Sequence, residues 1–148
     1  YCEKALGTLL AKSPTFRELY GKINSSGGWT WMIEVNNSFP VAAGTATEKT
    51  LELGLDGSGI IKTYVNPTKT GRYTTVDGKE LTASLERLLA HEIGHVIGRI
   101  EEGRSHSVTE SSYDKAIEVE NTIMGEIYSN APLRDIYDPL HRSQRPRP

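Results

Sequence analysis

The sequence contains a single cysteine, Cys2, among its 148 residues. One cysteine cannot form a disulfide within the chain, and it excludes a zinc site built from several thiolates. No apolar run approaches the roughly 18 residues of a membrane-spanning helix, and no segment has the order of charged, apolar and small residues that marks a signal peptide. Because the chain begins with Tyr1 rather than Met, we expect a preceding segment, which could carry a targeting signal.

The sequence also lacks an excess of either charge, with 17 Lys and Arg against 19 Asp and Glu. We therefore expect no general attraction to nucleic acid or to a membrane surface. A length of 148 residues with 36% hydrophobic residues suits one domain with a modest core. We assign residues 1–141 to this domain and residues 142–148, which place three arginines among prolines, to a flexible tail. We expect a monomer.

Periodicity and turn residues predict a small α+β domain. Helices are expected over residues 3–12, over 14–23 before a turn at 24–28, from an N-cap at Thr82 to about Arg99, and over residues 112–128. Strands are expected over residues 29–35, 50–55 and 60–65, with an extended piece at 73–76, a loop over 36–50, a hairpin turn at 56–59 and a further turn at 77–78. The sheet is expected to be mostly antiparallel.

The strongest motif is His91-Glu92-Ile93-Gly94-His95, a His-Glu-x-x-His sequence within an apolar stretch of helical period. On a helix, His91 and His95 lie one turn apart on the same face, so both imidazoles can reach one metal ion. Zinc held in this way acidifies a bound water, and Glu92 can take its proton during attack on a carbonyl. The motif therefore predicts one Zn²⁺ ion, with His91 and His95 as ligands and Glu92 as the catalytic base.

A catalytic zinc normally takes three protein ligands, and Glu120 is the candidate for the third. Glu120 lies three residues from both Ile117 and Ile123 on the apolar stripe of the 112–128 helix, so its side chain is expected to point into the interior. A buried carboxylate needs compensation, which a metal ion would supply. A salt bridge to a buried arginine is the alternative explanation.

Other residues compete for the third position. Residues 91–98 also fit the start of the metzincin pattern, which places its third ligand at Glu101 in this chain, and Ile123-Met124-Gly125 resembles the methionine turn of that group. His106 could serve if its loop folded back, whereas Glu118 lies on the opposite helix face. Farther on, Arg134 and Tyr137 are three residues apart and could donate to the oxyanion of a tetrahedral intermediate, although ordinary surface contacts explain this spacing equally well.

These features together resemble the zinc endopeptidase family of type III secreted effectors that includes NleD, and related peptidase domains of Rhs-type toxins. The resemblance runs roughly over residues 13–137. It rests on Ser-Pro-Thr-Phe-Arg-Glu-Leu-Tyr from Ser13, Gly57-Ser58-Gly59 before a strand ending at Asn66-Pro67, the motif in Leu89–His95, Glu120-Asn121, and Pro132-Leu133-Arg134-Asp135-Ile136-Tyr137.

The resemblance implies a zincin-like fold, with His91, His95 and Glu120 as zinc ligands, Glu92 as the base, and Arg134 and Tyr137 in a C-terminal catalytic element. It also implies a bacterial effector or toxin that acts in the host cytoplasm on signalling proteins such as mitogen-activated protein kinases. Fold resemblance does not fix a substrate. A binding module that keeps zinc without catalysis, and an adaptor acting through the Arg-Pro tail, remain open.

Overall fold

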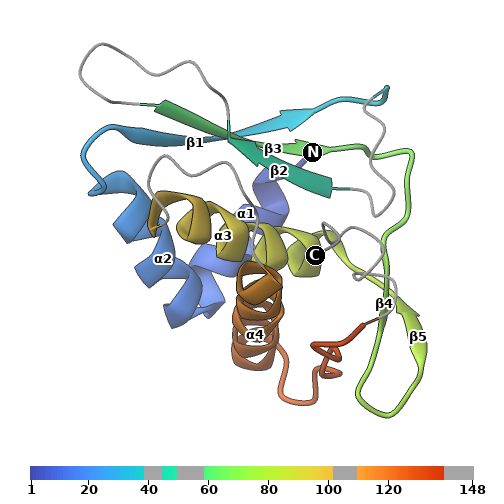
Figure 1. Cartoon of the computed structure of the whole chain (residues 1–148). Coiled ribbons are helices and arrows are strands. Elements are labelled where there is room, and N and C mark those ends of the chain that lie inside the picture. The colour runs from blue at the N-terminus through green and yellow to red at the C-terminus, as the bar shows by residue number, and fades with distance from the viewer. Residues whose placement is uncertain (39–44, 50–58, 102–109, 139–148) are drawn as a thin grey trace.

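The computed structural model describes residues 1–38, 45–49, 59–101 and 110–138 (Figure 1). The chain forms a small mixed α+β domain, as predicted. Its helices are α1 (Glu3–Lys12), α2 (Pro14–Asn24), α3 (Leu85–Glu101) and α4 (Glu110–Ile127). Its strands are β1 (Trp29–Val35), β2 (Thr45–Lys49), β3 (Gly59–Val65), β4 (Arg72–Thr74) and β5 (Glu80–Thr82). The proposed tail at 142–148 lies outside the described residues.

The three-stranded sheet has the order β1-β3-β2, with β3 in the centre. β3 pairs with β2 in the antiparallel direction and with β1 in the parallel direction. The expectation of a mostly antiparallel sheet is therefore wrong for its longest pairing. The reason lies in the order of the strands: the chain leaves β1, forms the far edge as β2, and then returns between the two. Because β2 runs opposite to β1 and β3 runs opposite to β2, β3 is parallel to β1.

One further strand prediction needs correction. β2 begins at Thr45, inside the segment expected to be a loop, because pairing with β3 extends a stretch that has no clear apolar period of its own. The strand expected over residues 50–55 lies outside the described residues, as does most of the turn at 56–59. By contrast, the strands expected over 29–35 and 60–65 are confirmed as β1 and β3.

The starts of α2 and α3 follow from short polar side chains. The Ser13 hydroxyl accepts a hydrogen bond from the Phe16 N–H, and Pro14 occupies the first turn of α2, as predicted. The start of α3 was predicted at Thr82, but Ser84 accepts from the Arg87 N–H instead. Thr82 belongs to β5, and the Ala83 N–H still bonds the Gly71 carbonyl, so the helix can begin only after that pairing ends.

The helices pack against one face of the sheet, and α3 is the central element of this arrangement (Figure 1). Alternate residues of β3 are buried against the helices, as expected for a strand with one covered face. The largest buried apolar side chains come from α1, α2, β3, α3 and α4: Leu9, Phe16, Ile61, Val65, Leu89, Ile93, Val96, Ile117 and Ile123. In the described ranges, no helix is both long and apolar enough to cross a membrane.

α4 approaches α3 closely at Gly94, inside the His-Glu-x-x-His motif. A Cβ atom on Gly94 would lie 2.8 Å from the Cα atom of Ala116. Only glycine permits this approach without moving a helix backbone. Ala116 lies four residues before Glu120, so the contact also sets how closely the α4 carboxylate can reach α3.

We expect Gly94→Ala to destabilise the protein by about 1–3 kcal/mol, the usual cost of overfilling a packed contact. Gly98→Ala is the matched control on the same helix, because a Cβ there meets no atom within 4 Å. That change should be neutral or stabilise by up to about 1 kcal/mol, since alanine favours helix over glycine. Chemical denaturation of both variants measures the difference, and equal stability would contradict the close-contact argument.

Candidate functional site

His91 and His95 face each other on α3. Their rings lie nearly perpendicular, with centroids 4.7 Å apart, and their Nε2 atoms are 2.9 Å apart. Two unprotonated nitrogens at this distance would repel each other, so they must share either a proton or a cation. A tetrahedral zinc ion with bonds of about 2.0–2.1 Å separates its ligand nitrogens by about 3.3 Å. The pair therefore fits two metal ligands after a small opening.

Glu92 lies between these histidines in sequence and is buried on α3. Its position on the helix follows from the motif: it occupies the residue next to His91, about a quarter turn around the axis from that side chain. A carboxylate at this position can accept a proton near a metal held by the two histidines.

Glu120 is completely buried on α4, as the apolar neighbours in the sequence predicted. Its Oε1 atom lies 2.9 Å from Nδ1 of His91 and 2.9 Å from Nη1 of Arg134. Its Oε2 atom accepts a 2.6 Å hydrogen bond from Nη1 of Arg87. The structure thus brings Glu120 to His91, but at Nδ1, on the far side of the ring from the nitrogen that faces His95. The ion pair with buried arginine, the alternative explanation, is present.

Arg87 was not singled out in the sequence, yet only 2% of its surface is exposed. Its second terminal nitrogen donates to the Pro132 carbonyl at 2.7 Å, and its guanidinium lies 4.2 Å from the ring centroid of Tyr73. The sequence spacing could have identified Arg87 as a neighbour of the site. Arg87 precedes His91 by four residues, so it shares the helix face of the two histidines.

Arg134 is also buried, and its guanidinium is held from two sides. Besides the bond to Glu120, Nε donates to Asp138 at 2.8 Å. Asp138, which the sequence analysis also missed, is completely buried and accepts from the Thr74 N–H. The amide of Asn121 pairs with both the N–H and the carbonyl of Arg134. Arg134 lies only four residues before Asp138, whereas Thr74 comes from β4 and is distant in the sequence.

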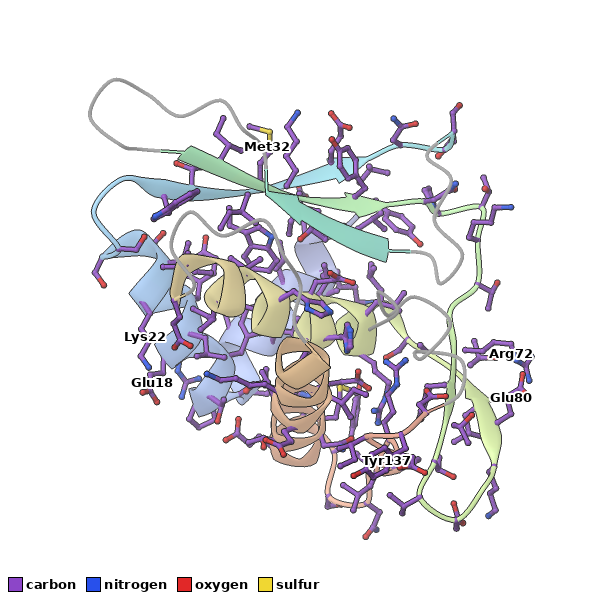
Figure 2. All side chains as sticks on the ribbon, viewed as in Figure 1. Glu18, Lys22, Met32, Arg72, Glu80 and Tyr137 are labelled. Atoms are coloured by element: carbon purple, nitrogen blue, oxygen red, sulfur yellow. The ribbon has the colours of Figure 1, made fainter. Side chains whose placement is uncertain are left out.

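Tyr137 lies on that same C-terminal segment, which forms an isolated bridge from Arg134 to Thr75, just after β4, and 55% of its surface is exposed (Figure 2). Its backbone N–H bonds the Asp135 carboxylate. Arg134 and Tyr137 therefore have different surroundings. Arg134 belongs to a buried ionic cluster with Arg87, Glu120 and Asp138. Tyr137 is accessible to a large substrate.

The competing third ligands are placed as follows. Glu101 is exposed at the end of α3, 2.8 Å from Lys115, and Glu118 is exposed on α4. His106 lies outside the described residues. Within the part of the chain that the structure describes, no three His, Cys, Asp or Glu side chains are gathered as a metal site. The predicted set of His91, His95 and Glu120 stays a prediction.

The ionic cluster also sets the acidity of Glu120. Burial raises the pKa of this carboxyl, but the hydrogen bond from His91 and the charges of Arg134, His91 and Arg87 outweigh burial and lower the pKa to about 2. Because the pKa lies below its ordinary value, the ionised carboxylate stabilises the folded state at neutral pH.

We expect this stabilisation, on the order of 3 kcal/mol, to be complete above about pH 4.5 and to be lost as the pH falls toward 2. Urea unfolding between pH 7 and pH 3 measures it. Glu118→Gln removes an exposed carboxylate from the same helix and should keep the wild-type pH dependence, whereas Glu120→Gln should flatten it. An unchanged slope in Glu120→Gln would contradict the assignment.

Comparison with protein-family models, curated proteins and solved structures finds no match to this chain. The resemblance to the family that includes NleD therefore stays a prediction from motifs. The site itself consists of a histidine pair on α3, one member of which contacts a buried cluster of arginines and carboxylates.

Proposed function

We propose that the protein is a zinc-dependent endopeptidase with a zincin-like fold, in which His91 and His95 hold the metal and Glu92 is the general base. One observation carries this proposal: the two Nε2 atoms face each other at 2.9 Å, while Nδ1 of His91 contacts a carboxylate. Metal-binding histidines typically donate their second ring N–H to a carboxylate or carbonyl, which fixes the ring and its tautomer.

Zinc bound at this pair would polarise the scissile carbonyl and make an attacking water more acidic. Glu92 would take the proton from that water and deliver it to the leaving amine, so that no net proton is gained or lost by the protein. The guanidinium of Arg134 has two of its three nitrogens bonded to Glu120 and Asp138. Tyr137, which is largely exposed, is therefore the residue that we propose as the donor to the oxyanion.

The substrate class comes from the motif resemblance alone. It supports a bacterial effector or toxin that cleaves host signalling proteins, such as mitogen-activated protein kinases, in the host cytoplasm. Incubation of the purified protein with such a kinase, with and without a zinc chelator, tests this part of the proposal.

Zinc analysis of the purified protein tests the metal site itself. We expect one zinc per chain in the wild type and a loss of tight binding in both His91→Ala and His95→Ala. A wild type that binds no zinc would overturn the proposal. One zinc without cleavage of any peptide bond would favour the non-catalytic zinc module, in which the buried Glu92 has no catalytic use.

Tyr137→Phe provides a separate test of the oxyanion role. Because the phenol would bind charge present only in the transition state, we expect kcat to fall by about 10²–10³ with little change in KM. Zinc content should stay normal, and the exposed position predicts a melting temperature close to that of the wild type. Full activity in this variant would remove the tyrosine from the mechanism.

A further inference from the structure

We infer that Glu120 acts from outside the metal's coordination sphere: it positions His91, and Arg87 holds it in place for that task. This inference rests on the proposed zinc site. It differs from the motif-based expectation that Glu120 is itself the third ligand, and it makes Arg87 a positioning residue of the site.

Glu120 contacts Nδ1 of His91, the ring nitrogen that does not face His95. An ionised carboxylate can only accept hydrogen bonds, so Nδ1 of His91 must carry the proton in the 2.9 Å contact. The lone pair of a neutral His91 then lies on Nε2, which is the nitrogen facing His95. Glu120 thereby selects the tautomer that a metal shared by the two histidines requires.

Both carboxylate oxygens of Glu120 are also bonded to arginines. Arg134 bonds the same oxygen that His91 contacts, and Arg87 bonds the other oxygen at 2.6 Å. A metal ion between the two histidines would be bound at Nε2 of His91. To coordinate that ion directly, the Glu120 carboxylate would have to leave both arginines and move around the imidazole ring. Buried Arg87 would then lose its carboxylate partner and Arg134 would keep only Asp138, which is strongly unfavourable.

Arg87 holds the Glu120 carboxylate through contacts with three other parts of the chain. Its two terminal nitrogens bond Glu120 on α4 and the Pro132 carbonyl after α4, and its plane lies near the Tyr73 ring. These contacts use the planar fork of a guanidinium, and an ammonium group cannot reproduce them. Arg87 therefore joins the helix that carries the histidines to the elements that carry the carboxylate.

The test compares Glu120→Gln and Arg87→Lys with the exposed control Arg72→Lys. Arg72 also pairs with a glutamate, Glu80, but about half of each side chain is exposed. Zinc affinity is measured by competition with a chromophoric chelator, and coordination is followed by the visible spectrum of the Co²⁺-substituted protein. Folding of each variant is checked by amide NMR spectra.

We expect Glu120→Gln and Arg87→Lys each to weaken zinc binding by about 10–100-fold while keeping one metal per chain and the wild-type Co²⁺ spectrum. Arg72→Lys should match the wild type in both measurements. In the metal-free wild type, ¹⁵N NMR should find the His91 proton on Nδ1. Should Glu120→Gln fail to fold, Arg87→Lys, which keeps the charge, decides the outcome.

Loss of stoichiometric zinc or a changed Co²⁺ spectrum in Glu120→Gln would show a direct ligand and overturn the inference, while leaving the zinc endopeptidase intact. Unchanged zinc affinity in Arg87→Lys would overturn the role of Arg87. A wild type that binds no zinc would overturn the proposed function and this inference together, so the two failures are distinguishable.

Discussion

Replacing Glu92 by glutamine should lower the rate of peptide cleavage by about 10²–10⁴-fold and leave the zinc content at one ion per chain. The amide has nearly the same shape as the carboxylate but cannot take a proton from water at neutral pH. Because Glu92 is not proposed as a ligand, the metal and the fold should be retained. Cleavage assays and metal analysis on the same preparation measure both quantities.

Glu101→Gln is the control for this experiment, because it removes a carboxylate from the exposed end of the same helix. It should keep wild-type cleavage and zinc content. Loss of zinc in Glu101→Gln would instead support the metzincin-like arrangement with Glu101 as a ligand. A Glu92→Gln enzyme that cleaves at the wild-type rate would show that the mechanism is wrong.

The second large effect is expected from Glu120→Ala, which we predict to destabilise the protein by about 3–5 kcal/mol. The change leaves Arg87 and Arg134 buried without the carboxylate that both of them contact. For a domain of this size, the loss corresponds to a fall in melting temperature of roughly 6–20 °C. Thermal unfolding followed by circular dichroism measures it.

The measurement should be repeated with excess chelator, because the metal alone could also account for a change in stability. If the ionic cluster is the cause, the difference between the wild type and Glu120→Ala persists without zinc. If Glu120 stabilises only as a zinc ligand, the difference disappears. Glu118→Ala, on the exposed face of the same helix, should change stability by no more than about 0.5 kcal/mol.

Local sequence signals were sufficient for the elements that depend on local chemistry. Ser13-Pro14 begins α2 because a hydroxyl cap and a proline are favoured at the first helical positions. Alternating residues predicted β1 with its observed bounds, and the motif spacing placed His91 and His95 on one helix face. The apolar neighbours of Glu120 likewise predicted its burial.

The tertiary structure decided what depends on residues distant in the sequence. The parallel pairing of β1 with β3 follows from where β2 returns, and no pattern within β1 encodes it. The two arginine partners of Glu120, Arg87 and Arg134, are 33 and 14 residues away in the sequence. The periodicity that predicts a buried carboxylate does not specify which cation pairs with it. A helical pattern reflects only residues that are close together in the sequence. Which nitrogen of His91 faces Glu120 depends instead on how α4 packs against α3. The sequence alone thus determined that a metal-binding motif and a buried glutamate occur together, and only the packing decided that they meet at Nδ1.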